Sequence, residues 1–279
     1  MARLWRERED VVYPVTRSRE RAAQWNREGF ESLVADIRRP ETLGDLPAVD
    51  TILFAVGYDR SSGGSIYDVY VDGFRNLLDA LPRASGPVIY TSSTGVYAQG
   101  DGTWVDEDSA CEPRREGGKA CLAAEKMLLG HPRGRDAKIL RLAGLYGPGR
   151  IPRSADVIAG RPLPVTNEDY LNLIHVDDAA RAVLAAAAVH SEVARTYTIS
   201  DGAPTTRREF FTELARLLKA PLPRFEIAEG WSERRSSTNK RIRNDRMIKE
   251  LGIRPMYTTS REGLAAIFSG TPPSESTGD

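Results

Sequence analysis

The segment at residues 51–56 constrains the fold more than any other part of the chain. It reads Thr-Ile-Leu-Phe-Ala-Val, so five apolar residues follow one another without polar alternation. A strand that is apolar on consecutive positions is buried on both faces, which is typical of a parallel sheet covered by helices on each side. The segment therefore predicts an α/β fold.

Segments of the same strand type alternate along the chain with longer segments of helical apolar spacing. The strand-like segments are 11–15, 32–34, 51–56, 87–91, 138–142 and 196–199, and the helix-like segments are 67–81, 119–129, 177–189 and 207–218. This order is the βαβ pattern. We predict a doubly wound parallel sheet with helices on both faces.

Breaks in the pattern indicate two domains and a tail. After Tyr146, Gly and Pro at 147–149 and 161–164 interrupt the rhythm. We expect a doubly wound domain over residues 1–150 and a small α+β lobe over residues 151–268, from which residues 177–199 return to the first domain. Residues 269–279 are mainly Gly, Ser, Thr, Pro and acidic residues with little to bury, so we predict that they are disordered.

Composition argues against several classes of partner. With 39 basic and 39 acidic side chains the net charge is zero, so nucleic acid and anionic membranes exert no strong overall attraction. The two cysteines, Cys111 and Cys121, are too few for a disulfide framework or a zinc site. The first ten residues lack the apolar core of a signal peptide, and no apolar run approaches the roughly 18 residues that cross a bilayer. We expect a cytoplasmic protein that binds a small-molecule substrate, and neither nucleic acid nor a membrane.

Five stretches in matching order resemble the extended short-chain dehydrogenase/reductase family, in particular its NAD-dependent epimerase/dehydratase group. They lie at 88–97, 139–149, 172–180, 197–202 and 251–264. The most specific of them, Val-Ile-Tyr-Thr-Ser-Ser-Thr-Gly-Val-Tyr at 88–97, looks like the strand that runs into the family's catalytic serine loop. The resemblance covers residues 11–268 and implies a Rossmann-like, NAD(P)-binding fold.

Ser93 is the first candidate for a catalytic side chain. A serine at the carboxyl end of a buried parallel strand lies where open α/β sheets bind ligands, and its hydroxyl can bind a substrate oxygen. The other interpretation is a serine-rich turn that satisfies loop backbone groups. The resemblance favours the catalytic role for Ser93 and implies that Ser92 contributes to cofactor binding.

The candidate cofactor contacts lie early in the chain. A dinucleotide-binding fold reads the adenosine ribose at the end of its second strand, where this chain has Arg17 and Arg19 and no acid. Arginine pairs with the 2′-phosphate of NADP, so the pattern favours NADP over NAD, unless both arginines are simply exposed. The resemblance places Asp36 beside the adenine, and Gly57 would let the backbone approach the cofactor.

For the three polar residues at 175–178 we predict structural and not catalytic roles. His175 lies in an apolar segment, where a packed histidine is more common than an acid or base. Asp177 and Asp178 begin a predicted helix, where carboxylates commonly cap the amino end. We expect these side chains to orient the strand and the helix.

One departure from the family concerns the start of the fold. The family opens with a strand and a glycine-rich turn that admits the pyrophosphate to a helix amino terminus, and this sequence contains neither. In the strand order 3-2-1-4-5-6 the first strand is central, so segments 11–15 and 51–56 would face a gap. Our hypothesis is that the natural polypeptide begins roughly 20 residues upstream. The rival is a chain that closes the gap by rearrangement or by pairing with another chain.

A second departure concerns the catalytic pair. The family places Tyr and Lys four residues apart on one helix face, where the ammonium lowers the phenol pKa for proton exchange. Keeping Lys119 as the lysine puts Arg115 at the tyrosine position, whereas aligning by Glu125 gives Gly117 and Cys121. Lys119 remains a candidate contact to the cofactor ribose or a solvated surface lysine.

The proton would then have to pass through another group. Tyr97, Tyr146 or a water are candidates, and nothing in the spacing favours one of them.

Two functions follow as expectations. The resemblance implies an NAD(P)-dependent oxidoreductase or epimerase/dehydratase that transfers a hydride to or from a carbonyl or sugar-nucleotide substrate, with Ser93 polarising the oxygen. The absent tyrosine favours the alternative, a dinucleotide sensor or scaffold without catalysis. Family members often pair through helices equivalent to segments 67–81 and 119–129, so a homodimer is expected by analogy.

Overall fold

The computed structural model describes residues 1–166, 168–226 and 238–270, and its chain divides into two compact units. The first unit consists of residues 1–92, 115–140 and 183–196, and the second of residues 93–114, 141–182 and 197–279. The domain boundary predicted at residue 150 stays a prediction. Most of the tail predicted to be disordered, from residue 271 onward, lies outside the described residues.

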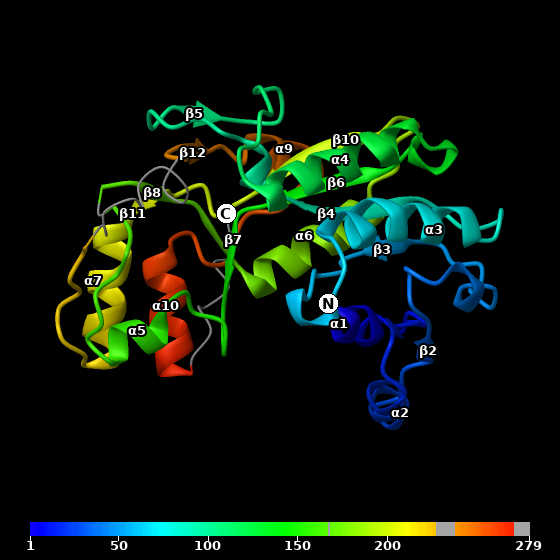
Figure 1. The fold of residues 1–279 in the computed structure, drawn as a ribbon, viewed down its shortest axis with the longest axis horizontal. Helices are drawn as coiled ribbons and strands as arrows, with labels where there is room; N and C mark the ends of the chain where they lie inside the picture. Colours follow the sequence, from blue (N-terminus) through cyan, green and yellow to red (C-terminus); the bar gives the residue numbers. More distant parts are fainter. Residues whose placement is uncertain (167, 227–237, 271–279) are drawn as a thin grey trace. The chain divides into compact units, whose positions relative to one another are not determined.

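The first unit contains the amino-terminal strands and three longer helices (Figure 1). Its elements are α1 (Ala2–Glu7), β1 (Val15–Thr16), α2 (Arg19–Arg27), β2 (Leu33–Val34), η1 (Pro40–Thr42), β3 (Ile52–Phe54), η2 (Arg60–Ser62), η3 (Asp68–Asp72), α3 (Gly73–Ala80), β4 (Val88–Ser93), α4 (Glu116–Gly130) and η5 (Pro132–Gly134). The helix predicted over 67–81 is present, and its first turn, η3, is a π-helix.

The second unit contains short strands and the carboxy-terminal helices. Its elements are η4 (Thr94–Val96), β5 (Trp104–Val105), β7 (Gly144–Tyr146), α5 (Ser154–Ile158), β8 (Tyr170–Leu171), β9 (Leu173–His175), β11 (Thr205–Thr206), α7 (Arg207–Leu218), β12 (Arg241–Ile242), α9 (Asp245–Leu251) and α10 (Ser260–Ser269). Four elements have residues in both units: β4, whose last residue Ser93 belongs to the second unit, β6 (Lys138–Leu142), α6 (Val176–Ala188) and β10 (Arg195–Ile199).

The largest sheet has four strands in the order β10-β6-β4-β3. β3 and β4 are parallel, with Ile52 opposite Val88 and Phe54 opposite Tyr90. This arrangement confirms the α/β fold class that segment 51–56 predicts. All of β3 and all of β4 except Ser93 lie in the first unit, where helices supply the cover.

β1 and β2 form a separate parallel pair and do not join the four-stranded sheet. Among the described strands, β1 pairs with β2 alone, and β3 pairs with β4 alone. Each of β1 and β3 therefore has one edge without a strand partner. Val15 and Val56, at or beside these two strands, are accordingly exposed.

The strand predicted over residues 11–15 is shorter than expected. Only Val15 and Thr16 are in β1, although the carbonyls of Val12 and Pro14 still accept hydrogen bonds from Glu31 and Leu33. Pro14 has no N–H to donate, and no second neighbour extends the ladder. One-sided pairing therefore shortens the strand.

Aromatic packing holds the first unit together. Phe54 of β3 stacks on Phe74 of α3 with ring centroids 3.9 Å apart, and Tyr90 of β4 lies 5.2 Å from Phe74. Ala124 and Leu128 of α4 join the same buried cluster. α3 and α4 therefore pack beside β3 and β4, as Figure 1 shows.

The second unit has a core of its own around α7 and α10. Tyr146, Phe210, Phe211 and Leu264 are buried in it. Thr206 begins α7 with a reciprocal capping box, in which its hydroxyl accepts from the Glu209 amide and the Glu209 carboxylate accepts from the Thr206 amide. Such a box satisfies two amide groups at the helix start, and it fixes where α7 begins.

The free edge of β3 makes a residue-level prediction for amide exchange. The Ile52 N–H donates to the Pro87 carbonyl at 3.0 Å, so the N–H of Leu53 points to the opposite, unpaired edge. We expect the Leu53 amide to exchange about 100-fold faster than the Ile52 amide, as measured by hydrogen-exchange NMR. Equal protection of the two amides would mean that another segment pairs with this edge.

Candidate functional site

The carboxyl end of β4 places two adjacent serines in different environments. Ser92 is buried and its hydroxyl donates to the Glu125 carboxylate of α4 at 2.5 Å. Ser93 is half-buried, and its hydroxyl oxygen accepts from the Gly95 amide at 3.0 Å, which caps the short helix η4. The predicted contact of Ser92 with a cofactor stays a prediction.

The hydrogen of the Ser93 hydroxyl remains available for a ligand. Its oxygen uses one lone pair for Gly95, and among the described residues no acceptor takes its hydrogen. The turn-forming role and the substrate-binding role that the sequence left open are therefore compatible in one side chain.

Helix α4 carries the positions of the catalytic pair. Cys121 and Glu125 are buried on the side that carries the bond from Ser92, and Gly117 lies one turn earlier on the same side. Lys119 lies two residues from both Gly117 and Cys121, and thus on the other side of the helix, where it is half exposed. This placement favours the register in which Gly117 and Cys121 take the pair's positions.

Lys119 is paired locally. Its ammonium lies 3.0 Å from the Glu116 carboxylate, and this hydrogen bond and charge raise the pKa of Lys119. Lys119 therefore keeps its proton through the neutral range, and its predicted contact with a cofactor ribose stays a prediction.

The space around Gly117 is open, whereas that around Cys121 is filled. A side chain at Gly117 would meet no atom within 4 Å of its Cβ. Burial raises the pKa of the Cys121 thiol, which lies beside the Tyr90 phenol. The tyrosine position thus has room for a side chain, and the lysine position holds an uncharged thiol.

The predicted cofactor residues of the first unit lie around the carboxyl end of β1. Arg17 is exposed, and Arg19 is the first residue of α2, whose amino end is capped by the Ser18 hydroxyl. Hydrogen bonds, from Arg38 to Asp36 and from Ser61 to Asp59, are the main causes that lower the pKa of these two carboxyl groups, and the charge of Arg17 adds a small contribution to each. The recorded ion pair of Asp36 is with Arg38, and a joint contact of Arg17 and Asp36 with a cofactor stays a prediction.

Asp36 is held in place by its neighbours. The pKa of the Asp36 carboxyl is lowered overall. Partial burial alone would raise this pKa, but the hydrogen bonds from Arg38 and the charges of Arg38 and Arg17 outweigh the effect of burial. The Arg38 guanidinium lies 3.4 Å from the carboxylate and also donates to the Gly63 carbonyl. Sequence reasoning missed Arg38, whose only signal was its position two residues after Asp36.

Gly57, which follows β3, has open space where a side chain would be. No atom lies within 4 Å of a Cβ built on it, and its φ is not positive. The glycine is thus not required by backbone strain. The open space is compatible with the predicted approach of a cofactor to Gly57, which stays a prediction.

The tyrosines named as alternative proton donors are buried in the second unit. The Tyr97 hydroxyl accepts from the Arg141 guanidinium at 2.8 Å, and burial raises the pKa of Tyr97 despite that charge. Burial also raises the pKa of Tyr146, whose ring packs edge-on to His175. Both phenols therefore keep their protons at neutral pH.

His175 and Asp178 make structural contacts, and Asp178 binds the carboxy-terminal segment where a cap of its own helix was expected. His175 is buried, its Nδ1 accepts from the Asp177 amide, and burial lowers its pKa. The Asp178 carboxylate accepts from the amides of Met256 and Tyr257. These bonds tie the start of α6 to the carboxy-terminal segment.

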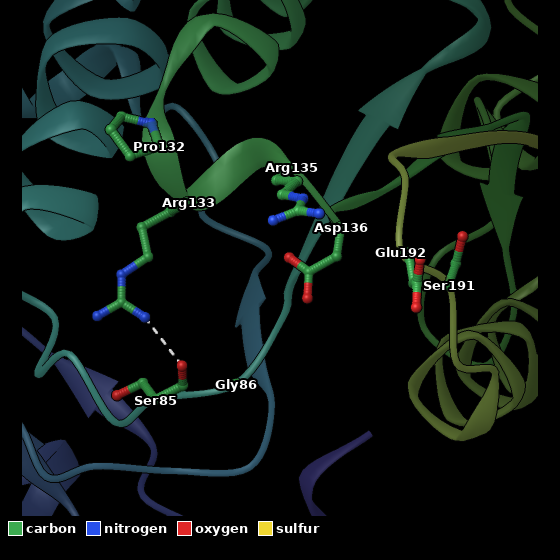
Figure 2. Close-up of a pocket in the computed structure, with 8 residues that line it drawn as sticks. All are labelled: Ser85, Gly86, Pro132, Arg133, Arg135, Asp136, Ser191 and Glu192. Atoms are coloured by element: carbon green, nitrogen blue, oxygen red, sulfur yellow. Dashed lines mark hydrogen bonds between the residues drawn. The ribbon is translucent and has the colours of Figure 1, made fainter.

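Figure 2 shows a hollow in the first unit. It is lined by Ser85, Gly86, Pro132, Arg133, Arg135, Asp136, Ser191 and Glu192. Arg133 closes one side by donating to the Ser85 carbonyl at 2.8 Å. Ser85 and Asp136 precede β4 and β6, so the hollow is at the amino ends of these strands, whereas parallel sheets bind ligands at the carboxyl ends.

Comparison with known proteins identifies the family. Residues 1–200 match the NAD dependent epimerase/dehydratase family. The chain belongs to this family. Among curated relatives of this family member, Protein YeeZ of Escherichia coli K12 is 32% identical over 220 residues, which are 78% of this chain and 75% of YeeZ.

Two further matches cover different shares of the epimerase/dehydratase chain. The 3-diazoavenalumate denitrifying reductase of a Streptomyces species is 35% identical over 139 residues, 45% of each chain. A solved Methylobacillus flagellatus structure assigned to the NAD-dependent epimerases/dehydratases is 28% identical, with a TM-score of 0.76, and covers 96% of this chain and 93% of its own. None of the helices in the described part of the chain is long and apolar enough to span a membrane.

Asp201, which follows β10, makes a prediction for stability. Burial raises its pKa from 3.8 to about 8, and its Oδ2 has no hydrogen-bond partner. Between these values the folded chain holds a proton that the unfolded chain has released, so stability falls as the pH rises from about 4 to about 8. Asp201→Asn removes this ionisation.

We expect Asp201→Asn to melt about 5 °C higher than the wild type at pH 9 and at nearly the same temperature at pH 4. Thermal melts followed by circular dichroism across this range measure the difference. A variant that is less stable at every pH would show that the Asp201 carboxyl makes contacts that the amide cannot replace.

Proposed function

We propose that this family member is an NAD(P)-dependent oxidoreductase that exchanges a hydride with a small-molecule substrate. Carbonyl compounds and sugar nucleotides are the substrate types that the sequence predicts. The observation that carries the proposal is Ser93, which combines the carboxyl end of a buried strand with an unused hydroxyl hydrogen in a chain of this family. The reductase named among its relatives supports the same class of chemistry.

The residues described in the first unit fit the adenosine end of a dinucleotide. Asp36 is held as a carboxylate by Arg38, Arg17 presents an exposed guanidinium, and the space beside Gly57 is open. Asp36 and Gly57 would hold the adenosine, with Ser92 and Lys119 as further predicted contacts. The nicotinamide, when bound, would supply or accept the hydride.

Ser93 would polarise the substrate. A hydroxyl fixed by the Gly95 amide has a defined orientation, so that its hydrogen can be donated to an oxygen or nitrogen atom of the ligand without a large loss of entropy. Lys119 is the second proposed catalytic side chain, with a protonated ammonium as its contribution. The family's tyrosine has no counterpart on α4.

The absent tyrosine favours a second candidate function, a sensor or scaffold that binds NAD(P) without turnover. The two functions differ in one observation. An oxidoreductase consumes NADPH or NADP in the presence of substrate, whereas a sensor binds it and releases it unchanged.

Arg17 and Arg19 make the prediction for cofactor choice. If they pair with the 2′-phosphate, Arg17→Ala with Arg19→Ala weakens NADPH binding about 10-fold and leaves NADH binding within about 2-fold. Isothermal calorimetry with both cofactors measures this. Arg27→Ala, at the other end of α2, is the matched control. Equal loss for both cofactors would contradict the preference for NADP, and no binding by the wild type would contradict the proposed function.

A further inference from the structure

The strand pair β5 and β12 in the second unit has an apolar inner face and an outer face with a different composition. The two strands are parallel, with Trp104 opposite Arg241 and Val105 opposite Ile242. Val105 and Ile242 are buried, whereas Trp104 is 39% exposed. Because side chains alternate along a strand, Trp104, Arg241 and Arg243 share the outer face. The core accounts for the inner face and leaves the composition of the outer face unexplained.

The Arg241 guanidinium lies against two aromatic rings. Its central carbon is 4.9 Å from the centroid of the Trp104 ring and 5.2 Å from that of the Tyr170 ring in β8. Its Nε donates to the Gly102 carbonyl at 2.7 Å. These three contacts restrict the rotation of a long side chain, so the guanidinium is held in one orientation before a ligand binds.

Hydrogen bonds between distant segments fix the backbone around this stack. The Asn239 side-chain oxygen accepts from the Tyr170 amide at 3.0 Å, and the Asn239 carbonyl accepts from the Gly102 amide at 2.8 Å. The φ of Gly102 is +80°, which favours glycine, and a Cβ there would lie 3.5 Å from the Tyr170 ring. The Arg241 amide donates to the Thr103 carbonyl at 2.9 Å. The stack is therefore built on a backbone that is held from both sides.

The Arg241 guanidinium keeps an unused hydrogen-bonding edge. Among the residues that the structure describes, no carboxylate pairs with Arg241, and its Nε is the only side-chain nitrogen with a hydrogen-bond acceptor. The terminal nitrogens form the planar fork that binds carboxylates through two parallel hydrogen bonds. Arg243, by contrast, already lies 3.5 Å from the Asp245 carboxylate. The outer face thus presents one guanidinium whose charge is not yet paired.

We propose that Arg241 anchors a binding site for an aromatic carboxylate. One unpaired guanidinium matches one negative charge, which favours a carboxylate over a phosphate group with two charges. The exposed part of Trp104 offers apolar surface to the ring that bears the carboxylate. The inference goes beyond the proposed function, since it involves neither Ser93 nor the predicted cofactor contacts.

The first experiment compares three ligands that share one ring system. They are 2-naphthoate with one negative charge, 2-naphthamide with none, and 2-naphthyl phosphate with two at neutral pH. Isothermal calorimetry with the full chain measures their dissociation constants. We expect the naphthoate to bind at least about 10-fold more tightly than either of the other two. Equal affinity for the naphthoate and the naphthamide would overturn the inference, and so would tightest binding of the phosphate.

The second experiment changes the guanidinium. Arg241→Lys keeps the charge and loses the planar fork, so we expect it to weaken naphthoate binding about 5-fold and to leave naphthamide binding unchanged. Arg241→Gln loses both, and its loss should be about 10-fold or more. Arg261→Gln removes an exposed arginine of α10 and is the matched control, with an expected change within about 2-fold. An equal loss in Arg261→Gln would mean that overall charge and not this site attracts the ligand.

The third experiment separates a ligand site from a purely structural stack. Trp104→Phe keeps an aromatic ring and should bind naphthoate within about 3-fold of the wild type, whereas Trp104→Ala should lose about 10-fold. A stack that only stabilises the strand pair gives another pattern, in which Arg241→Gln and Trp104→Ala melt at lower temperature but the wild type does not distinguish the naphthoate from the naphthamide. That pattern would overturn the inference. NADPH binding by the same variants should be unchanged, so the proposed function is tested separately.

Discussion

The burial of β4 against α3 and α4 is the constraint on which the described site depends. The aromatic contacts among Phe54, Phe74 and Tyr90 fix the first half of the strand. Because side chains alternate along a strand, this packing also decides that Ser92 turns inward to Glu125 while its neighbour Ser93 stays half-exposed. A change of register by one residue would exchange the two serines and bury the hydroxyl that is free to meet a ligand.

Much of the fold follows from local sequence, because the spacing of apolar residues within a segment differs between a strand and a helix. Segments 51–56 and 87–91 appear as β3 and β4, and segment 207–218 is α7 with the same bounds. The strand at 11–15 is shorter because its length depends on a second neighbour, which is not a property of the segment itself. The same limit applies to any edge strand.

The site was harder to predict than the fold, since its geometry comes from contacts between distant residues. The hydrogen bond between Ser92 and Glu125 joins residues 33 positions apart, and the local sequence around neither residue predicts this contact. Spacing alone left two registers open for α4, and only burial distinguishes Lys119 from Cys121. Arg38 was missed because an arginine in an arginine-rich chain carries no signal until its guanidinium is seen beside Asp36.

The unpaired edge of β3 has a consequence for how the protein behaves among copies of itself. A strand with free amides and carbonyls is a template for any other strand, and the exposed Val56 two residues after β3 adds apolar area that a second strand would cover. Solubility then depends on the charged side chains that flank the strand, Asp50 before it and Asp59 and Arg60 after it. High salt, which screens these charges, is the condition under which self-association through this edge is least opposed.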